Sequence, residues 1–150
     1  MKIKLDIGIE QYEEIKTELI EHGILIDDDA DWILSENNKY VAKLIVKEPT
    51  SGVRVVLPVE TIILIETFGH TVQVRTLDKI YHASERLYKI LNLLDPKMFL
   101  RISNSAIISK NKVKLITPTL STKFILTMSD GYKVDVTRSY YYIFREYFGI

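Results

Sequence analysis

Two short polar clusters interrupt apolar, strand-like runs between Phe99 and Arg138. The first cluster is Ser103-Asn104-Ser105, and the second is Thr137-Arg138-Ser139. Their amide, hydroxyl and guanidinium groups are those that bind base edges and phosphate oxygens. Only Asp130 and Asp135 oppose the cations in or beside this stretch, so the segment favours a polyanionic partner. Those cations are Lys97, Arg101, Lys110, Lys112, Lys114, Lys123, Lys133 and Arg138.

The formal net charge of the chain is zero, but its two parts differ in sign. Residues 1–36 hold 3 basic and 11 acidic side chains, a net charge of −8, whereas residues 37–150 hold 17 basic and 9 acidic ones, a net charge of +8. This asymmetry indicates an acidic appendage, 1–36, followed by a basic module, 37–150. The alternative, in which acidic and basic faces simply compensate each other, stays open.

Length and composition exclude several classes of protein. With 150 residues and 47% apolar content, the chain can bury a core and is not disordered. It contains no cysteine, which excludes disulfides, thiolate metal sites and a cysteine nucleophile. No apolar run approaches the roughly 20 residues of a membrane span, and the N-terminus lacks the apolar core of a signal peptide. We therefore expect a cytoplasmic protein without membrane insertion.

The sequence lacks the signatures of an enzyme or a metal site. Its three histidines show no metal-ligand spacing, and its six glycines form no phosphate-binding loop. The run Asp27-Asp28-Asp29 lacks the alternating ligands, central Gly and terminal Glu of a calcium loop. Glu60 and Glu66 are interpreted as surface residues at strand ends. We expect no enzymatic activity, no cofactor and no bound metal.

The acidic part has the pattern of a small β-α-β unit. Charged and apolar residues alternate over 2–7, which predicts a strand, and apolar residues at helical spacing predict a helix over Glu10–His22. Gly23 ends that helix, and Ile24-Leu25-Ile26 predicts a second strand. We expect this appendage to mediate dimerisation or to act as a regulatory element that shields the basic module when DNA is absent.

From Tyr40 onward the pattern is that of a mostly β fold with one or two short helices. Val41–Val46 and Val53–Leu57 predict a hairpin, and Asp130-Gly131 predicts another between flanking strands. Ser84 is a candidate N-cap for a helix that Pro96 ends, and the aromatic residues 140–148 predict a C-terminal helix. No helix-turn-helix is visible, so nucleic-acid contacts are expected on loops between strands.

Three blocks of this part, over about residues 44–148, resemble a LytTR domain. The family pattern is an isoleucine-rich strand ending in Glu, then Phe-x-Arg-x-His-x-Ser, then Gly-x-x-x-x-Val-Ser-Arg-x-Tyr. Here the blocks are residues 59–66 with Gly69-His70, residues 94–105, and residues 130–140. The chain departs from the pattern at Ser103, which replaces the usual His, and at Ala106, which replaces a larger residue.

The resemblance implies an elongated, multi-sheet β fold that binds double-stranded DNA. LytTR domains are the DNA-binding modules of many bacterial response regulators, and their loops enter the major groove. Carried over residue by residue, the base-contacting positions are His70, Asn104 and Arg138. The phosphate-contacting positions expected from the same comparison are Arg101, Ser105, Lys110, Thr137 and Ser139.

The acidic appendage stands where most family members have a receiver domain. We therefore expect a stand-alone bacterial transcription regulator that binds promoter DNA with paired half-sites as a homodimer, with a partner protein as a candidate controller of its activity. An alternative stays open, in which the domain is a protein-interaction or small-ligand sensor module that does not bind nucleic acid. Its expected feature is an exposed apolar patch formed by Tyr140-Tyr141-Tyr142 and Phe144.

Overall fold

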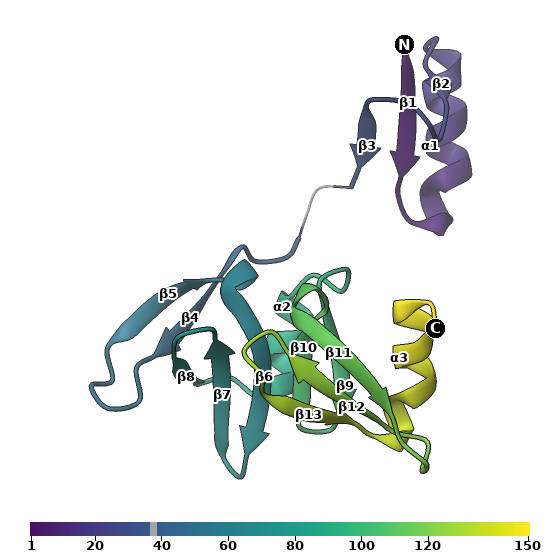
Figure 1. The fold of residues 1–150 in the computed structure, drawn as a ribbon. Helices are drawn as coiled ribbons and strands as arrows, with labels where there is room; N and C mark the ends of the chain where they lie inside the picture. The colour runs from purple at the N-terminus through teal and green to yellow at the C-terminus, as the bar shows by residue number, and fades with distance from the viewer. Residues whose placement is uncertain (37–38) are drawn as a thin grey trace. The chain divides into compact units, whose positions relative to one another are not determined.

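The chain consists of two units, Met1–Lys39 and Tyr40–Ile150 (Figure 1). The computed structural model describes residues 1–36 and 39–150. The boundary expected between residues 36 and 37 therefore falls outside the described residues. Among the residues that are described, no helix has the length and apolar character needed to cross a membrane.

The first unit is a parallel sheet with one helix. It comprises β1 (Lys2–Asp6), α1 (Ile9–Glu21), β2 (Leu25–Ile26) and β3 (Ile33–Ser35). The strand order is β2-β1-β3, with β1 parallel to both neighbours. Gly23 has φ +80°, which favours glycine, and its N–H donates to the carbonyl of Ile20 at 3.0 Å, so the helix ends there. Strand β3 is an addition to the elements that the sequence predicted.

The second unit is mostly β, as predicted, and contains two sheets and two α-helices. The helices are α2 (Leu87–Leu93) and α3 (Tyr141–Phe148). Short 3-10 helices are η1 (Val59–Thr61), η2 (Lys110–Lys112) and η3 (Arg138–Tyr140). The larger sheet contains β4 (Lys43–Lys47), β5 (Arg54–Pro58), β6 (Ile62–Phe68), β7 (Thr71–Thr76), β8 (Ile80–Ala83), β9 (Phe99–Ser103) and β10 (Ala106–Ser109). The smaller sheet contains β11 (Val113–Pro118), β12 (Phe124–Met128) and β13 (Lys133–Val136).

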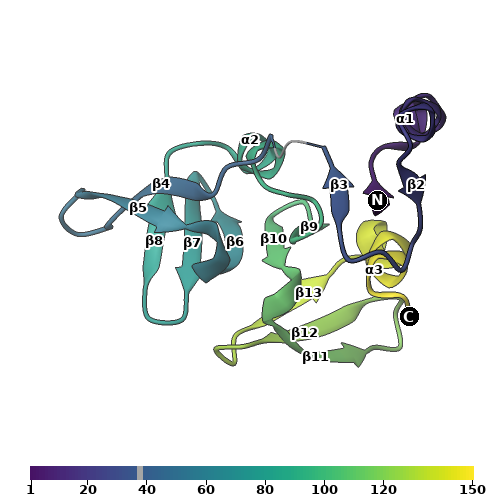
Figure 2. The same cartoon turned by 90° about the horizontal axis from the view of Figure 1, so that it is seen from above.

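The larger sheet is antiparallel in the order β5-β4-β8-β7-β6-β10-β9, and the smaller one is β11-β12-β13. Strands β6, β9 and β10 lie between the β4–β5 hairpin and the smaller sheet, and α3 lies beside that sheet (Figures 1 and 2). Both predicted hairpins are present. The predicted cap of α2 is wrong, because the helix begins after Arg86 and Ser84 lies two residues too early.

Strand β6 is buried on both faces and separates two hydrophobic cores. Ile62 and Ile65 pack in the first core with residues of β4, β7, β10 and α2. Ile63 and Leu64 pack in the second core with residues of β9, β10, β12, β13 and α3. All four side chains are at most 1% exposed. A register shift between Ile62 and Leu64 in the pairing with β7 accompanies this two-sided packing.

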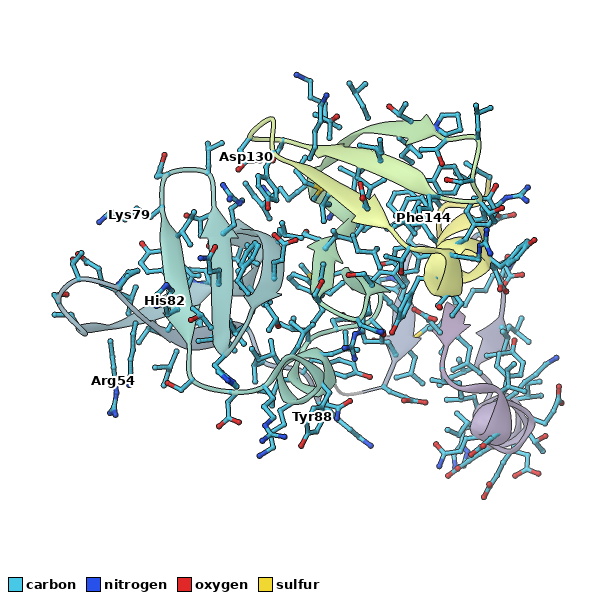
Figure 3. The ribbon with its side chains drawn as sticks, turned by 90° about the horizontal axis from the view of Figure 1, so that it is seen from below. Arg54, Lys79, His82, Tyr88, Asp130 and Phe144 are labelled. Atoms are coloured by element: carbon cyan, nitrogen blue, oxygen red, sulfur yellow. The ribbon has the colours of Figure 1, made fainter. Side chains whose placement is uncertain are left out.

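Aromatic side chains attach α3 to the smaller sheet. Phe144 of α3 is fully buried in the second core and is labelled in Figure 3. Its ring centroid lies 5.3 Å from that of Phe124 on β12, which in turn stacks on Tyr141 at 4.8 Å. Such aromatic packing fixes the helix that directly follows Arg138 and Ser139.

A polar cluster joins the two sheets where the β12–β13 turn meets β6 and β7. The Tyr132 hydroxyl donates to Glu66 Oε1 at 2.7 Å, and Arg75 Nη1 lies 3.4 Å from Asp130 Oδ2 (Figure 3 labels Asp130). The Arg75 guanidinium also lies 3.9 Å from the centre of the Tyr132 ring. Glu66, which we expected at the surface, is therefore partly buried and links the sheets.

Replacing Phe144 by Ala should strongly destabilise the second unit. Deletion of a fully buried aromatic side chain leaves a cavity, and typical losses are about 3–5 kcal/mol in the free energy of unfolding. Denaturant titration followed by circular dichroism measures this change. Tyr142→Ala is the matched control, because Tyr142 lies on the same helix but is 70% exposed. Equal losses for both variants would contradict the assignment of Phe144 to the core.

Replacing Tyr132 by Phe should reduce the loss of stability at alkaline pH. Burial raises the pKa of Tyr132 above its ordinary value of 10.0, and the hydrogen bond and negative charge of Glu66 raise it further. Because the folded state holds this proton more tightly, the stabilisation is complete below pH about 10 and is lost as pH rises through the raised pKa.

The measurement is the free energy of unfolding at a series of pH values from neutral to strongly alkaline. The variant should also lose about 0.5–1.5 kcal/mol at neutral pH, because Glu66 loses its hydroxyl partner. Tyr142→Phe serves as the control for the other tyrosines. An alkaline decline that is identical in Tyr132→Phe and the unmodified chain would refute the contribution of this hydroxyl.

Candidate nucleic-acid interface

Backbone pairing brings three polar segments to one end of the larger sheet. These segments are the Gly69-His70 turn between β6 and β7, the Asn104-Ser105 turn between β9 and β10, and Thr137–Ser139 after β13. The Thr67 N–H donates to the carbonyl of Ser105 at 2.8 Å, which ties the first segment to the second. The Thr137 N–H donates to the carbonyl of Ile102 at 3.0 Å, which ties the third segment to the same strand.

His70 is presented by a tight turn. Phe68 pairs directly with Thr71, so the turn has only two central residues. Gly69 has φ +61°, and a glycine with positive φ at the first central position is typical of a type II′ hairpin turn. The His70 side chain is exposed, and no hydrogen bond or ion pair engages it within residues 1–36 and 39–150.

Hydrogen bonds from the Arg101 side chain stabilise the Asn104 turn. Arg101 Nε donates to the carbonyl of Ser103 at 3.0 Å, and its Nη2 donates to the carbonyl of Asn104 at 2.6 Å. Ser103 is buried, and its hydroxyl oxygen accepts a bond from the Ser105 N–H at 3.1 Å. The residue that replaces the histidine of the family pattern thus faces inward and shapes the turn.

The Asn104 side chain is exposed and contacts the third segment. Its Oδ1 accepts a long hydrogen bond, 3.3 Å, from the hydroxyl of Tyr140. Sequence reasoning placed Tyr140 at the end of the third block and in the apolar patch, but it assigned this residue no role at the candidate site. This contact places the Asn104 amide beside the segment that carries Arg138.

Arg138 is exposed at the start of η3. Across the described part of the chain, no hydrogen bond or ion pair engages this side chain. In particular, no ion pair joins it to Asp135 within those ranges. Thr137 precedes Arg138 and Ser139 follows it, so a hydroxyl-bearing residue stands on each side of this cation in the sequence. This arrangement suits the binding of an anionic or hydrogen-bond-accepting ligand.

Lys110 lies apart from these three segments. It follows the end of β10 that is opposite the Asn104 turn, and its ammonium lies 4.7 Å from the centre of the Tyr147 ring on α3. The Tyr147 hydroxyl donates to the carbonyl of Lys97 at 2.9 Å. Burial, and then the negative charge of Asp95, raises the pKa of Tyr147. Of the predicted phosphate-contacting residues, Ser105, Thr137 and Ser139 belong to the three segments. Arg101 lies on β9 and supports the Asn104 turn, and Lys110 lies apart from all three.

The apolar patch expected for a protein-interaction module is not formed as predicted. Phe144 is fully buried, Tyr140 and Tyr141 are partly buried, and only Tyr142 is well exposed. A groove of about 550 Å³ does lie between α2, β9 and α3, where Leu94, Phe99 and Ile143 are among the lining residues. The residues of the predicted patch are therefore divided between core, groove and solvent.

Known proteins match the second unit. The family model of the LytTr DNA-binding domain matches residues 53–149. A solved LytTr DNA-binding domain from Bacillus cereus superposes with a TM-score of 0.69 and 25% identity, over 73% of this chain and 99% of that one. The sensory transduction protein LytT of Bacillus subtilis is 35% identical over 72 residues, which cover 48% of this chain and 30% of that protein.

The similarity to LytT thus spans less than a third of that relative, whereas the solved domain is matched over nearly its whole length. The family model alone covers well over half of the chain. The fold, the order of the three sequence blocks and these matches agree, and the chain belongs to the LytTR family of DNA-binding domains.

Proposed function

We propose that this chain is a bacterial transcription regulator whose three polar segments bind promoter DNA in the major groove. The proposal rests mainly on the exposed guanidinium of Arg138, which no described residue engages, close to the exposed Asn104 amide. Both groups sit on backbone that hydrogen bonds and a packed helix hold in place. Side chains on such rigid supports can discriminate between bases, because the protein loses little conformational entropy on binding.

The three base-contacting residues suit different acceptors and donors. Arg138 can donate two hydrogen bonds to guanine O6 and N7, which is the commonest specific contact in the major groove. Asn104 can donate to adenine N7 and accept from its amino group. His70 can donate to an acceptor on a base edge from the adjacent turn.

Phosphate contacts would come from the same end of the sheet. Arg101 uses two of its five N–H donors on turn carbonyls, so its remaining donors are available for a phosphate oxygen. The hydroxyl groups of Ser105, Thr137 and Ser139 can donate to neighbouring phosphates. Lys110 lies beside α3, away from the three segments, so it would contact only phosphates outside the stretch of DNA that those segments bind.

The remaining features of the proposal follow from this role. A regulator of promoters works in the cytoplasm, acts without catalysis or cofactor, and gains specificity when two copies bind paired half-sites as a homodimer. The matched relatives named above come from Bacillus species, which agrees with a bacterial regulator. A partner protein would then be one means of controlling it.

Arg138→Ala should weaken binding to promoter DNA and relax the preference at one base pair. Loss of a bidentate contact costs about 1–3 kcal/mol of discrimination. The measurement is a gel-shift titration with DNA from upstream of the chain's own gene, at several salt concentrations and against a scrambled competitor. The matched control is Arg54→Ala, which removes an exposed cation from β5 (Figure 3). If Arg138→Ala and Arg54→Ala bind the promoter equally well, the site assignment is wrong.

Tyr140→Phe should reduce discrimination through Asn104 without unfolding the domain. The hydroxyl positions the amide, so its loss should cost about 0.5–1.5 kcal/mol of specific binding. The test is a double-mutant cycle with Asn104→Ala, in which a positioning role makes the two losses non-additive. The melting temperature of Tyr140→Phe should stay near that of the unmodified chain. Fully additive losses would show that Tyr140 acts independently of Asn104.

A further inference from the structure

The unit Met1–Lys39 has an unusually open sheet. Parallel sheets normally have both faces covered, and units near 40 residues usually need additional support such as oligomerisation. Among the described residues of this unit, the buried hydrophobic side chains are Ile3 and Leu5 of β1, and α1 buries none. The unit therefore leaves apolar surface that a partner could cover.

The longest run of exposed apolar residues described in this unit is Trp32–Leu34, at β3. Every residue of β3 is exposed, including Ile33 at 64% and Leu34 at 40%, and the preceding Trp32 is 69% exposed. Strand β3 is also an edge strand, because the order of the sheet is β2-β1-β3. An apolar edge strand of this kind is a template for pairing with another strand.

The two edges of the sheet differ in how they are protected. Strand β2 has only two residues and is followed by Asp27-Asp28-Asp29, so a second copy at that edge would meet like charges. The acidic helix α1 also contacts β2. By contrast, the segment Trp32–Ser35 contains no charge and no proline, although Asp31 and Glu36 flank it. The Glu36 carboxylate accepts a hydrogen bond from the Gly8 N–H at 2.9 Å, within its own copy. The longer, uncharged strand β3 is therefore the better edge for pairing.

The register of β3 determines which backbone groups face outward. The Lys4 N–H donates to the carbonyl of Trp32 at 2.7 Å, and Lys4 is the register partner of Ile33. In a parallel ladder of this register, the backbone groups of Trp32 and Leu34 face β1. Because successive residues alternate, the N–H and C=O groups of Ile33 and Ser35 face the open edge.

We propose that a second copy of this chain pairs on that edge, with β3 antiparallel to its equivalent about a two-fold axis at Leu34. Ile33 of each copy then exchanges two backbone hydrogen bonds with Ser35 of the other. The two Leu34 residues face each other as a non-hydrogen-bonded pair, for which the Cα atoms lie about 4.5 Å apart. The contact is isologous, so the same surface on both copies closes a dimer.

This surface explains how two strongly acidic units associate. Helix α1 contacts β2, so pairing through β3 keeps the acidic helix of each copy away from the axis. An edge of three residues buries less than the roughly 800 Å² per partner of a standard interface. In the absence of DNA the dimer is therefore weak and concentration-dependent. It gains avidity when both copies bind adjacent half-sites.

Disulfide cross-linking tests the proposed two-fold axis directly. The chain contains no cysteine, so Leu34→Cys introduces a single thiol. A Cα separation of about 4.5 Å lies within the roughly 4.4–6.8 Å range of disulfides. Under mild oxidation the full-length variant should form a covalent dimer several-fold faster than Leu93→Cys. Leu93 is the matched control, because it is also 40% exposed but lies on α2.

A charge on the edge gives an independent measurement. Ile33→Lys should abolish the concentration-dependent dimer in sedimentation velocity, whereas Ile45→Lys should keep it, since Ile45 is 65% exposed on β4. Circular dichroism is the check that both variants remain folded. Equal cross-linking rates for Leu34→Cys and Leu93→Cys, or a dimer that survives Ile33→Lys, would overturn the proposal.

The inference names the surface of the homodimer in the proposed function, but its tests use no DNA. Arg138→Ala should lose promoter binding and still dimerise. If the chain binds promoter DNA but Leu34→Cys forms no disulfide-linked dimer, the β3 surface is rejected and the DNA-binding proposal stands. A disulfide-linked dimer with unaltered DNA binding by Arg138→Ala would reject only the DNA site.

Discussion

The burial of β6 on both faces is the constraint on which the second unit depends. Ile62–Ile65 supply side chains to two cores at once, and β10 does the same through Ile107 on one side and Ile108 on the other. An unpaired polar group among these buried residues would carry a large desolvation cost. The side chains that are available to a ligand therefore lie on the segments that follow the strands, where they meet solvent.

The polar residues near those segments divide into two groups with different tasks. Arg101, Ser103 and Glu66 direct their hydrogen bonds inward, to the turn or to the neighbouring sheet. His70 and Arg138 have no such partner in the described ranges and remain available to a ligand. A basic or polar residue in a matching motif can thus serve the fold, the ligand or both, and only its neighbours show which.

Local patterns were sufficient for most elements, whereas long-range contacts were not predictable from the sequence. Alternation and turn residues predicted the hairpins, because both depend on neighbours in the chain. Strand β3 was missed, since three residues cannot establish a period and its partner β1 lies nearly 30 residues earlier. The Tyr132–Glu66 bond spans 66 residues and leaves no local signature. Polar and basic residues indicated two of the three candidate segments, and the family resemblance added the Gly69-His70 turn. The inward role of Arg101 required coordinates.

The two-residue turns of this domain restrict how its relatives can diverge. Phe68 pairs directly with Thr71, and Ser103 pairs with Ala106 beside a register shift, so each turn has only two central residues. Inserting one residue would shift the register and turn buried side chains toward solvent. Descendants of such a domain can therefore change their target by exchanging side chains at fixed positions, but not by lengthening loops as antibodies do. Alignments of this family should accordingly be free of gaps at these turns.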